Sequence, residues 1–168
     1  MLADAGYDVL LGSQRGCAYS RRHKKWTRQD PRYWRYTLDD VALYDMPALV
    51  SMAQPLWGER RLFYVGYSAG THSLYALLQL PPDLRPSLRA ALLLAAAVLF
   101  TRHHNPLIKA LASFPDRTLD AQLLSRKSSL NFGVFVMPPE DWDHFDYVAN
   151  TQAPRLIYDR ILGVIAGL

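Results

Sequence analysis

Residues 62–70 read Leu62-Phe63-Tyr64-Val65-Gly66-Tyr67-Ser68-Ala69-Gly70. The apolar run at residues 62–65 predicts a strand, and the apolar pattern after Gly70 predicts a helix that begins near Thr71. Gly66 and Gly70 stand two positions either side of Ser68, where glycine allows a sharp turn without Cβ clashes. This G-x-S-x-G arrangement is typical of a nucleophile elbow, a strand–turn–helix unit that raises a serine hydroxyl above the edge of a sheet.

The alternative interpretation is a glycine-rich turn that only joins two core elements. The flanking sequence favours the elbow, because a strand is predicted before it and apolar residues at Leu74, Leu77 and Leu78 suit a helix after it. In an elbow, the hydroxyl of Ser68 attacks an ester carbonyl, and the N–H of Ala69 helps to hold the oxyanion. Ser68 and Ala69 are therefore the first candidate site residues.

The rest of the chain predicts an alternation of strands and helices. Strands are expected at residues 7–11, 62–65, 89–98 and 132–136, and helices at residues 33–54, 71–80, 107–114, 119–126 and 154–166. Pro47 interrupts one helix, where a kink is expected, and the alanines of residues 89–98 also suit a helix. This order predicts an α/β fold, in which a mostly parallel sheet carries helices on both faces.

The bulk composition predicts one domain, and a serine hydrolase would require no metal or organic cofactor. The chain has 168 residues, half of them apolar and one fifth charged, which is typical of a soluble globular domain. Its one cysteine, Cys17, excludes an intramolecular disulfide and a cysteine-rich metal site. The longest apolar run, residues 90–100, is short of the ~20 residues of a transmembrane helix. Residues 1–12 lack the pattern of a signal peptide.

A basic stretch contributes much of the formal net charge of +4. Its cations are Arg15, Arg21, Arg22, Lys24, Lys25 and Arg28. Such a stretch suits either an anionic surface, nucleic acid included, or a solvated loop. No nucleic-acid motif accompanies it, so the sequence favours the loop and predicts no nucleic-acid partner.

A serine nucleophile needs a base, and histidine is the usual one. In enzymes with this elbow the order along the chain is Ser, then Asp or Glu, then His on a loop after the last strand. His144 fits that place, because it lies between the predicted strand at 132–136 and the closing helix. The alternative is a surface-loop histidine among acids. His72 is expected to pack or cap locally, and His103 and His104 to be solvated.

The acid that orients the base should lie between residues 99 and 130, where Asp116 and Asp120 are the only carboxylates. Neither follows a recognisable strand. Asp116 is the better candidate, because it stands in the turn-like sequence Ser-Phe-Pro-Asp. Three further aspartates surround the predicted base and are expected to shape its loop or to orient it locally: Asp141, Asp143 and Asp146.

In four blocks the chain resembles the acid lipase family, the eukaryotic α/β-hydrolases that include gastric and lysosomal acid lipases. The blocks are Leu2-Ala3-Asp4-Ala5-Gly6-Tyr7-Asp8-Val9 with Arg15-Gly16 and Tyr19-Ser20-Arg21-Arg22-His23; Asp39 with Tyr44-Asp45-Met46-Pro47-Ala48; residues 64–71; and Asp143-His144-Phe145-Asp146-Tyr147. The chain departs from the family at Tyr67 and Ala69, where His and Gln are usual, and at Cys17, where Asn is usual.

The resemblance implies a partial α/β-hydrolase domain over residues 1–168. Residues 1–99 would form the half with the strands and the elbow, residues 100–130 a remnant of the cap and acid loop, and residues 131–168 the last strand, the histidine loop and the final helix. The chain begins after the family's first strands, and the His-Gly segment that supplies a second oxyanion amide is absent. A fragment or shortened isoform is therefore expected.

The resemblance also implies a function: hydrolysis of lipid esters such as acylglycerols or sterol esters, through Ser68, His144 and Asp116. It implies contact with a lipid–water interface and a secreted or lysosomal setting. The alternative is an impaired hydrolase-like fragment or a lipid-binding module. Loss of one oxyanion donor costs about 10²–10³ in rate, and loss of the acid costs about 10⁴.

Overall fold

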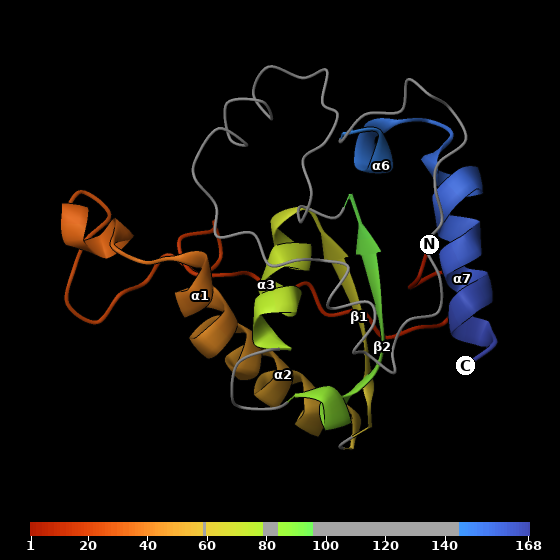
Figure 1. Cartoon of the computed structure of the whole chain (residues 1–168), viewed down its shortest axis with the longest axis horizontal. Coiled ribbons are helices and arrows are strands. Elements are labelled where there is room, and N and C mark those ends of the chain that lie inside the picture. The colour runs from red at the N-terminus through yellow and green to blue at the C-terminus, as the bar shows by residue number, and fades with distance from the viewer. Residues whose placement is uncertain (59, 79–83, 96–144) are drawn as a thin grey trace.

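The computed structural model describes residues 1–58, 60–78, 84–95 and 145–168. At its centre, strand β1 (Leu62–Tyr67) pairs in parallel with β2 (Leu88–Leu94) (Figure 1). Helices α2 (Met46–Ala53) and α3 (Ala69–Leu77) cover one face of this pair, and α7 (Asp159–Ala166) covers the other. The predicted α/β fold, with a parallel sheet between helices, is confirmed.

Two hydrophobic clusters fill the two faces of the sheet, because successive strand side chains point to opposite sides. Leu62 and Tyr64 of β1 pack against the first cluster, whose buried members are Ala42, Met46, Leu74, Ala76, Leu77 and Leu88. Phe63 packs against the second, whose buried members are Ala153, Ile157, Ile161 and Ile165. Side chains of the two clusters therefore contact β1 from both sides, although Val65 near its end is 41% exposed.

The closing helix was predicted over residues 154–166 and is confirmed. It begins as a wide π-helical turn, η5 (Pro154–Tyr158), and continues as α7. Pro154 occupies the first turn, where its missing N–H costs no hydrogen bond. Its three buried isoleucines recur every fourth residue, so they form one stripe against the sheet. A short helix, α6 (Asp146–Ala149), precedes it.

The helix predicted at residues 33–54 begins later, at α1 (Leu38–Asp40), and residues 31–34 form a separate 3₁₀ turn, η1 (Pro31–Trp34). Thr37 and Asp40 explain this start, since each side chain accepts a hydrogen bond from the other residue's N–H. A π-helical turn, η2 (Val41–Asp45), follows α1, and Pro47 is the second residue of α2, where its missing N–H costs no hydrogen bond. After α2, η3 (Gln54–Trp57) ends the helical run.

The strand expected at residues 7–11 is absent, and that prediction was wrong. In the described structure these residues pair with neither β1 nor β2, and the side chain of Leu11 is 89% exposed. A strand is stable only with a hydrogen-bonded neighbour, so an apolar run by itself does not make one. Leu2 and Tyr7 instead pack against the cluster under α7.

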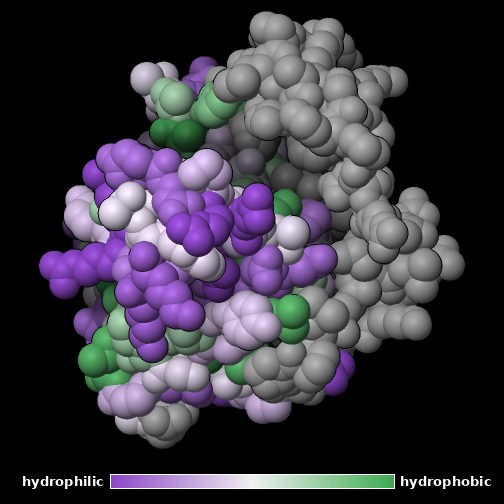
Figure 2. Space-filling model, turned by 90° about the vertical axis from the view of Figure 1, so that its left-hand side faces the viewer, coloured by the Kyte–Doolittle hydropathy of each residue, from purple (hydrophilic) through white to green (hydrophobic). Residues whose placement is uncertain are grey.

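Residues 13–37 form a loop that projects on the side of α1 (Figure 1), and hydrophilic residues gather on this face of the molecule (Figure 2). The exposure of residues 21–25 agrees with the loop predicted for the basic stretch. Among the described residues, no helix is long and apolar enough to cross a membrane. The predictions for residues 107–114, 119–126 and 132–136 lie outside the described part of the chain.

Candidate functional site

Ser68 alone connects β1 to α3. The strand ends at Tyr67 and the helix begins at Ala69, two residues before the expected start. The backbone of Ser68 has φ 52° and ψ −115°, and Ala95 is the only other non-glycine residue with positive φ in the described ranges. Such a conformation costs roughly 1–3 kcal/mol, is kept only where the surroundings enforce it, and is concentrated at functional sites.

The turn needs glycine at position 66 because the strand and the helix approach each other closely. A Cβ atom on Gly66 would lie 2.7 Å from Cε1 of Tyr64 and 3.1 Å from the carbonyl carbon of Gly70. Neither Gly66 nor Gly70 has positive φ. The two glycines thus provide space for the turn, and the strained backbone angle falls on the serine.

Three hydrogen bonds hold the turn in place. The hydroxyl of Tyr64 donates to the carbonyl of Gly70 at 2.7 Å, and the hydroxyl of Thr71 donates to the carbonyl of Ser68 at 2.6 Å. The N–H of Ser68 donates to the carbonyl of Leu94 at 3.0 Å. The strand β1, the helix α3 and the neighbouring strand β2 therefore all fix the backbone at Ser68.

A second layer of contacts supports the start of α3. Ser73, which is completely buried, donates to the carbonyl of Ala69 at 3.1 Å and accepts from Nε2 of Gln14 at 2.9 Å. Gln14 thereby connects the N-terminal segment to the helix that follows the serine. Sequence reasoning missed these supporting residues, although the hydroxyls at positions 71 and 73 of a helix with an apolar face were a visible sign.

The side chain of Ser68 is half-buried and caps no N–H group of α3. It makes no hydrogen bond with the described residues. Ala69 is exposed and occupies the first position of α3, where helical N–H groups lack acceptors within the helix. The helix dipole adds partial positive charge at this end. The hydroxyl of Ser68 therefore lies beside the N-terminal N–H groups of α3.

The predicted partners of Ser68 lie outside the described residues, so the structure does not test their assembly. These are His144, Asp116, the alternative acid Asp120, the loop aspartates Asp141 and Asp143, and also His103 and His104. Asp146 is the first residue of α6. His72 is half-buried on α3. The roles of His144 and Asp116 stay predictions.

The Tyr64 hydroxyl offers a test of the support beneath the turn. Burial raises the pKa of Tyr64 to about 12, so the folded state favours the protonated phenol. Tyr64→Phe is expected to lower the free energy of unfolding by about 1 kcal/mol at neutral pH. This difference should be constant below the usual tyrosine pKa of about 10 and shrink as the pH rises toward 12, because only the wild type has a group at position 64 whose ionisation costs stability.

Urea unfolding of both proteins at a series of pH values measures this difference. Tyr44→Phe is the matched control, since Tyr44 is 62% exposed and should show little change in stability. A gap between wild type and Tyr64→Phe that stays constant up to a pH of about 11 would contradict the expectation.

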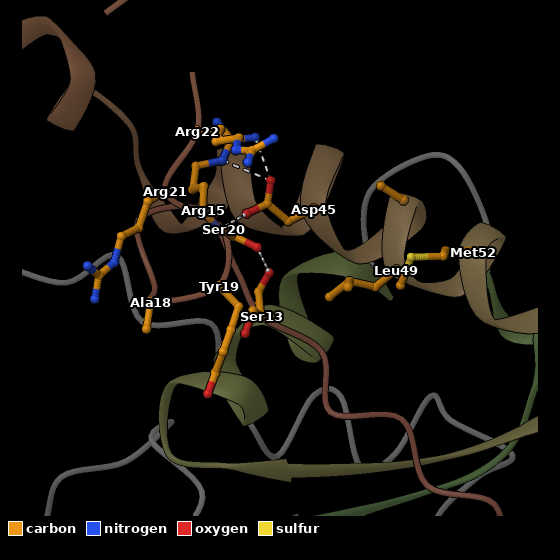
Figure 3. Close-up of a pocket in the computed structure, with 11 residues that line it drawn as sticks. Ser13, Arg15, Ala18, Tyr19, Ser20, Arg21, Arg22, Asp45, Leu49 and Met52 are labelled. Atoms are coloured by element: carbon orange, nitrogen blue, oxygen red, sulfur yellow. Dashed lines mark hydrogen bonds and ion pairs between the residues drawn. The ribbon is translucent and has the colours of Figure 1, made fainter. Parts of the chain in front are cut away.

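A separate surface cavity of about 700 Å³ lies between the projecting loop and α2 (Figure 3). Its lining includes Arg15 and Asp45 but not Ser68. Nε and Nη2 of Arg15 donate to Oδ1 of Asp45 at 2.8 and 2.7 Å, and the backbone N–H of Arg15 donates to Oδ2 at 2.7 Å. The hydrogen bond to Asp45 raises the pKa of Arg15 further. This pair anchors the loop to the helices.

In the described part of the chain, no three His, Cys, Asp or Glu side chains lie together as a metal site would require. The turn at Ser68 and the cavity beside Arg15 are two candidate functional features of the described residues. The first combines the strained backbone of Ser68 with the N–H groups at the start of α3. The second has cations beside apolar side chains.

Comparison with known proteins gives the context of the site. A family model described as the alpha/beta hydrolase fold matches residues 1–118. Human lipase member K is 38% identical over 109 residues, which are 65% of this chain and 27% of the relative. Mouse lipase member K is 40% identical over 104 residues, which are 61% of this chain and 26% of the relative.

A probable lipase of Schizosaccharomyces pombe is 35% identical over 109 residues, which are 65% of this chain and 23% of the relative. The chain thus matches about a quarter of the length of these curated relatives. The acid lipase resemblance of the sequence agrees with these relatives, and three of its four blocks lie within residues 1–118.

Proposed function

Because the chain belongs to the alpha/beta hydrolase fold family, we propose that it is a lipase-type serine hydrolase with Ser68 as its nucleophile. The observation that carries the proposal is the backbone of Ser68, with φ 52° between a parallel strand and a helix. In this fold, a sharp and strained strand-to-helix turn exposes the reactive serine. The lipase relatives support lipid esters as substrates.

The proposed reaction is acyl transfer through the serine. Oγ of Ser68 attacks the ester carbonyl carbon while His144 takes its proton, and the N–H of Ala69 donates to the oxyanion that forms. The C–O bond to the alcohol then breaks, and His144 returns the proton to the leaving alcohol. In the second half of the reaction, a water oxygen attacks the acyl carbon while His144 takes a proton from the water. The bond from that carbon to Oγ of Ser68 then breaks, His144 returns the proton to Oγ, and the fatty acid is released. Asp116 is proposed to orient His144.

The finer features of the proposal follow the resemblance. Acylglycerols or sterol esters are the proposed substrates, the lipid–water interface is the proposed place of action, and a secreted or lysosomal setting is proposed. Neither the resemblance nor the relatives imply a metal or organic cofactor for the acyl transfer.

A fluorophosphonate probe on the purified chain, with a short-chain nitrophenyl ester as substrate, tests the proposal. We expect covalent labelling of the folded protein, with the label located by mass spectrometry on the peptide that contains Ser68. Heat-denatured protein should not be labelled, since activation of the serine depends on its surroundings. Folded protein that remains unlabelled would instead favour an impaired hydrolase-like module.

A further inference from the structure

The basic arm, defined as residues 21–35, carries more positive charge than the chain as a whole. It holds seven Lys or Arg residues and one Asp, a net charge of +6, against +4 for all 168 residues. The rest of the chain is therefore slightly acidic. The arm belongs to the loop that projects beyond α1 (Figure 1), on the face where hydrophilic residues gather (Figure 2).

Aromatic contacts give the basic arm a defined shape. The ring of His23 stacks on Trp26 with centroids 4.6 Å apart, and Nδ1 of His23 accepts hydrogen bonds from the N–H groups of Lys25 and Trp26, each at 3.0 Å. Nε1 of Trp34 donates to the carbonyl of Arg28 at 2.8 Å. Lys24 and Lys25 are thus presented by a folded loop.

Most cations of the arm have no carboxylate partner in the part of the chain that the structure describes. Arg32 pairs with Asp30 at 2.7 Å. Within the described ranges, no ion pair involves Arg21, Arg22, Lys24, Lys25 or Arg35. Arg22, Lys24 and Lys25 border one surface depression of about 430 Å³. Three uncompensated charges around one hollow create a positive potential that attracts anionic groups.

Apolar surface lies directly beside these charges. The cavity in Figure 3 is lined by Arg21 and Arg22 on the loop and by Leu49 and Met52 on α2. Met52 is 53% exposed, and Tyr19, which also lines the cavity, is 94% exposed. Tyrosine with an apolar ring and a polar tip suits the boundary between headgroups and acyl chains. The surface is thus both cationic and apolar.

We infer that the basic arm and the adjoining cavity bind the surface of an anionic lipid aggregate. Arg22, Lys24 and Lys25 contact the headgroup phosphates, while Tyr19 and Met52 contact the apolar layer beneath them. The inference rests on the proposed function for the choice of a lipid partner and adds the surface by which the chain reaches it.

The aromatic rings of the arm argue against nucleic acid as the partner. Proteins that bind single strands offer aromatic faces on which bases stack. Here Trp26 is engaged by His23 and by Arg32, whose guanidinium lies 5.5 Å from the ring centroid. Trp34 is engaged by Tyr33 and Arg28. The unpaired charges are therefore available to phosphate groups, whereas the two tryptophan rings are already in contact with other side chains and are not available to stack on bases.

Vesicle sedimentation tests the inference. The chain should bind vesicles of phosphatidylcholine with phosphatidylserine, and not vesicles of phosphatidylcholine alone. Lys24→Gln/Lys25→Gln should weaken binding about 30-fold, because each basic residue near an anionic surface contributes about 1 kcal/mol. Raising the salt concentration should release the wild-type chain, because mobile ions screen exposed charges.

Arg60→Gln/Arg61→Gln is the matched control. It removes the same charge from exposed residues at the start of β1, away from the arm (Figure 1), and should bind as the wild type does. Equal weakening of both double variants would overturn the inference, since net charge alone would then explain binding. Absence of wild-type binding to the anionic vesicles would overturn it too, and salt-sensitive binding to an oligonucleotide instead would identify nucleic acid as the partner.

Two measurements separate this inference from the proposed function. Ser68→Ala should bind anionic vesicles as the wild type does. The Lys24→Gln/Lys25→Gln variant should react with the soluble fluorophosphonate probe as the wild type does, because Ser68 does not line the depression that the two lysines border. If the wild-type chain bound anionic vesicles but was not labelled by the probe, the proposed hydrolase function would be contradicted and the vesicle-binding inference would not.

Discussion

Ser68→Ala is expected to abolish fluorophosphonate labelling and to lower the rate of ester hydrolysis by about 10⁴-fold or more. Removal of the nucleophile leaves only the contribution of the oxyanion donors and of substrate binding. Labelling and the hydrolysis of a nitrophenyl ester are measured on the same protein preparation. Ser51→Ala is the matched control, because Ser51 lies exposed on α2 and should keep the wild-type rate.

A second substitution at the same position separates catalysis from strain. Ser68→Gly should be as inactive as Ser68→Ala but more stable by about 1 kcal/mol, because glycine adopts positive φ without the steric cost that alanine retains. Urea unfolding of the two variants measures this difference. Equal stability would contradict the assignment of strain to Ser68, whatever the kinetic result.

Gly66→Ala is expected to destabilise the chain by about 3 kcal/mol, the upper end of the usual cost of overpacking. The new methyl group would lie 2.7 Å from Cε1 of Tyr64 and 3.1 and 3.2 Å from the carbonyl carbon and oxygen of Gly70. Two of these three atoms belong to the backbone, which cannot rotate away. Urea unfolding measures the loss, and displacement of Gly70 should reduce labelling of Ser68 in the protein that remains folded.

Gly70→Ala provides the comparison for Gly66→Ala. Its methyl group would meet only the hydroxyl of Tyr64, at 3.4 Å, which is an ordinary contact. We expect its stability to change by less than about 1 kcal/mol, since alanine also favours the helix. Equal losses in the two variants would show that close approach of β1 and α3 does not explain the glycine at position 66.

The core of the fold could be predicted from the sequence because its elements have strong local patterns. The apolar run before Gly66 and the amphipathic pattern after Pro154 each suit one element, and both are present. The strand at residues 7–11 failed because pairing depends on a neighbour that a local pattern does not specify. The helix start was misplaced although Thr37 and Asp40 have the spacing of a capping box.

The candidate site was predictable only in part. The motif identified the position of Ser68, since glycines at fixed spacing indicate a tight turn. The contact between Gln14 and Ser73 was not predictable, because it joins residues 59 positions apart. The hydrogen bond from Tyr64 to Gly70 also depends on how the strand meets the helix. Asp116, His144 and the proposed division of residues 1–168 stay predictions.

The hydrogen bond from the N–H of Ser68 to the carbonyl of Leu94 extends the contact between β1 and β2 one residue beyond the end of β1, to the proposed nucleophile. Its amide hydrogen can therefore exchange with solvent only when the two strands separate locally. The same opening event would release the serine from its strained geometry. The proposed reactivity of Ser68 and the protection of its amide hydrogen would then both depend on the pairing of β1 with β2.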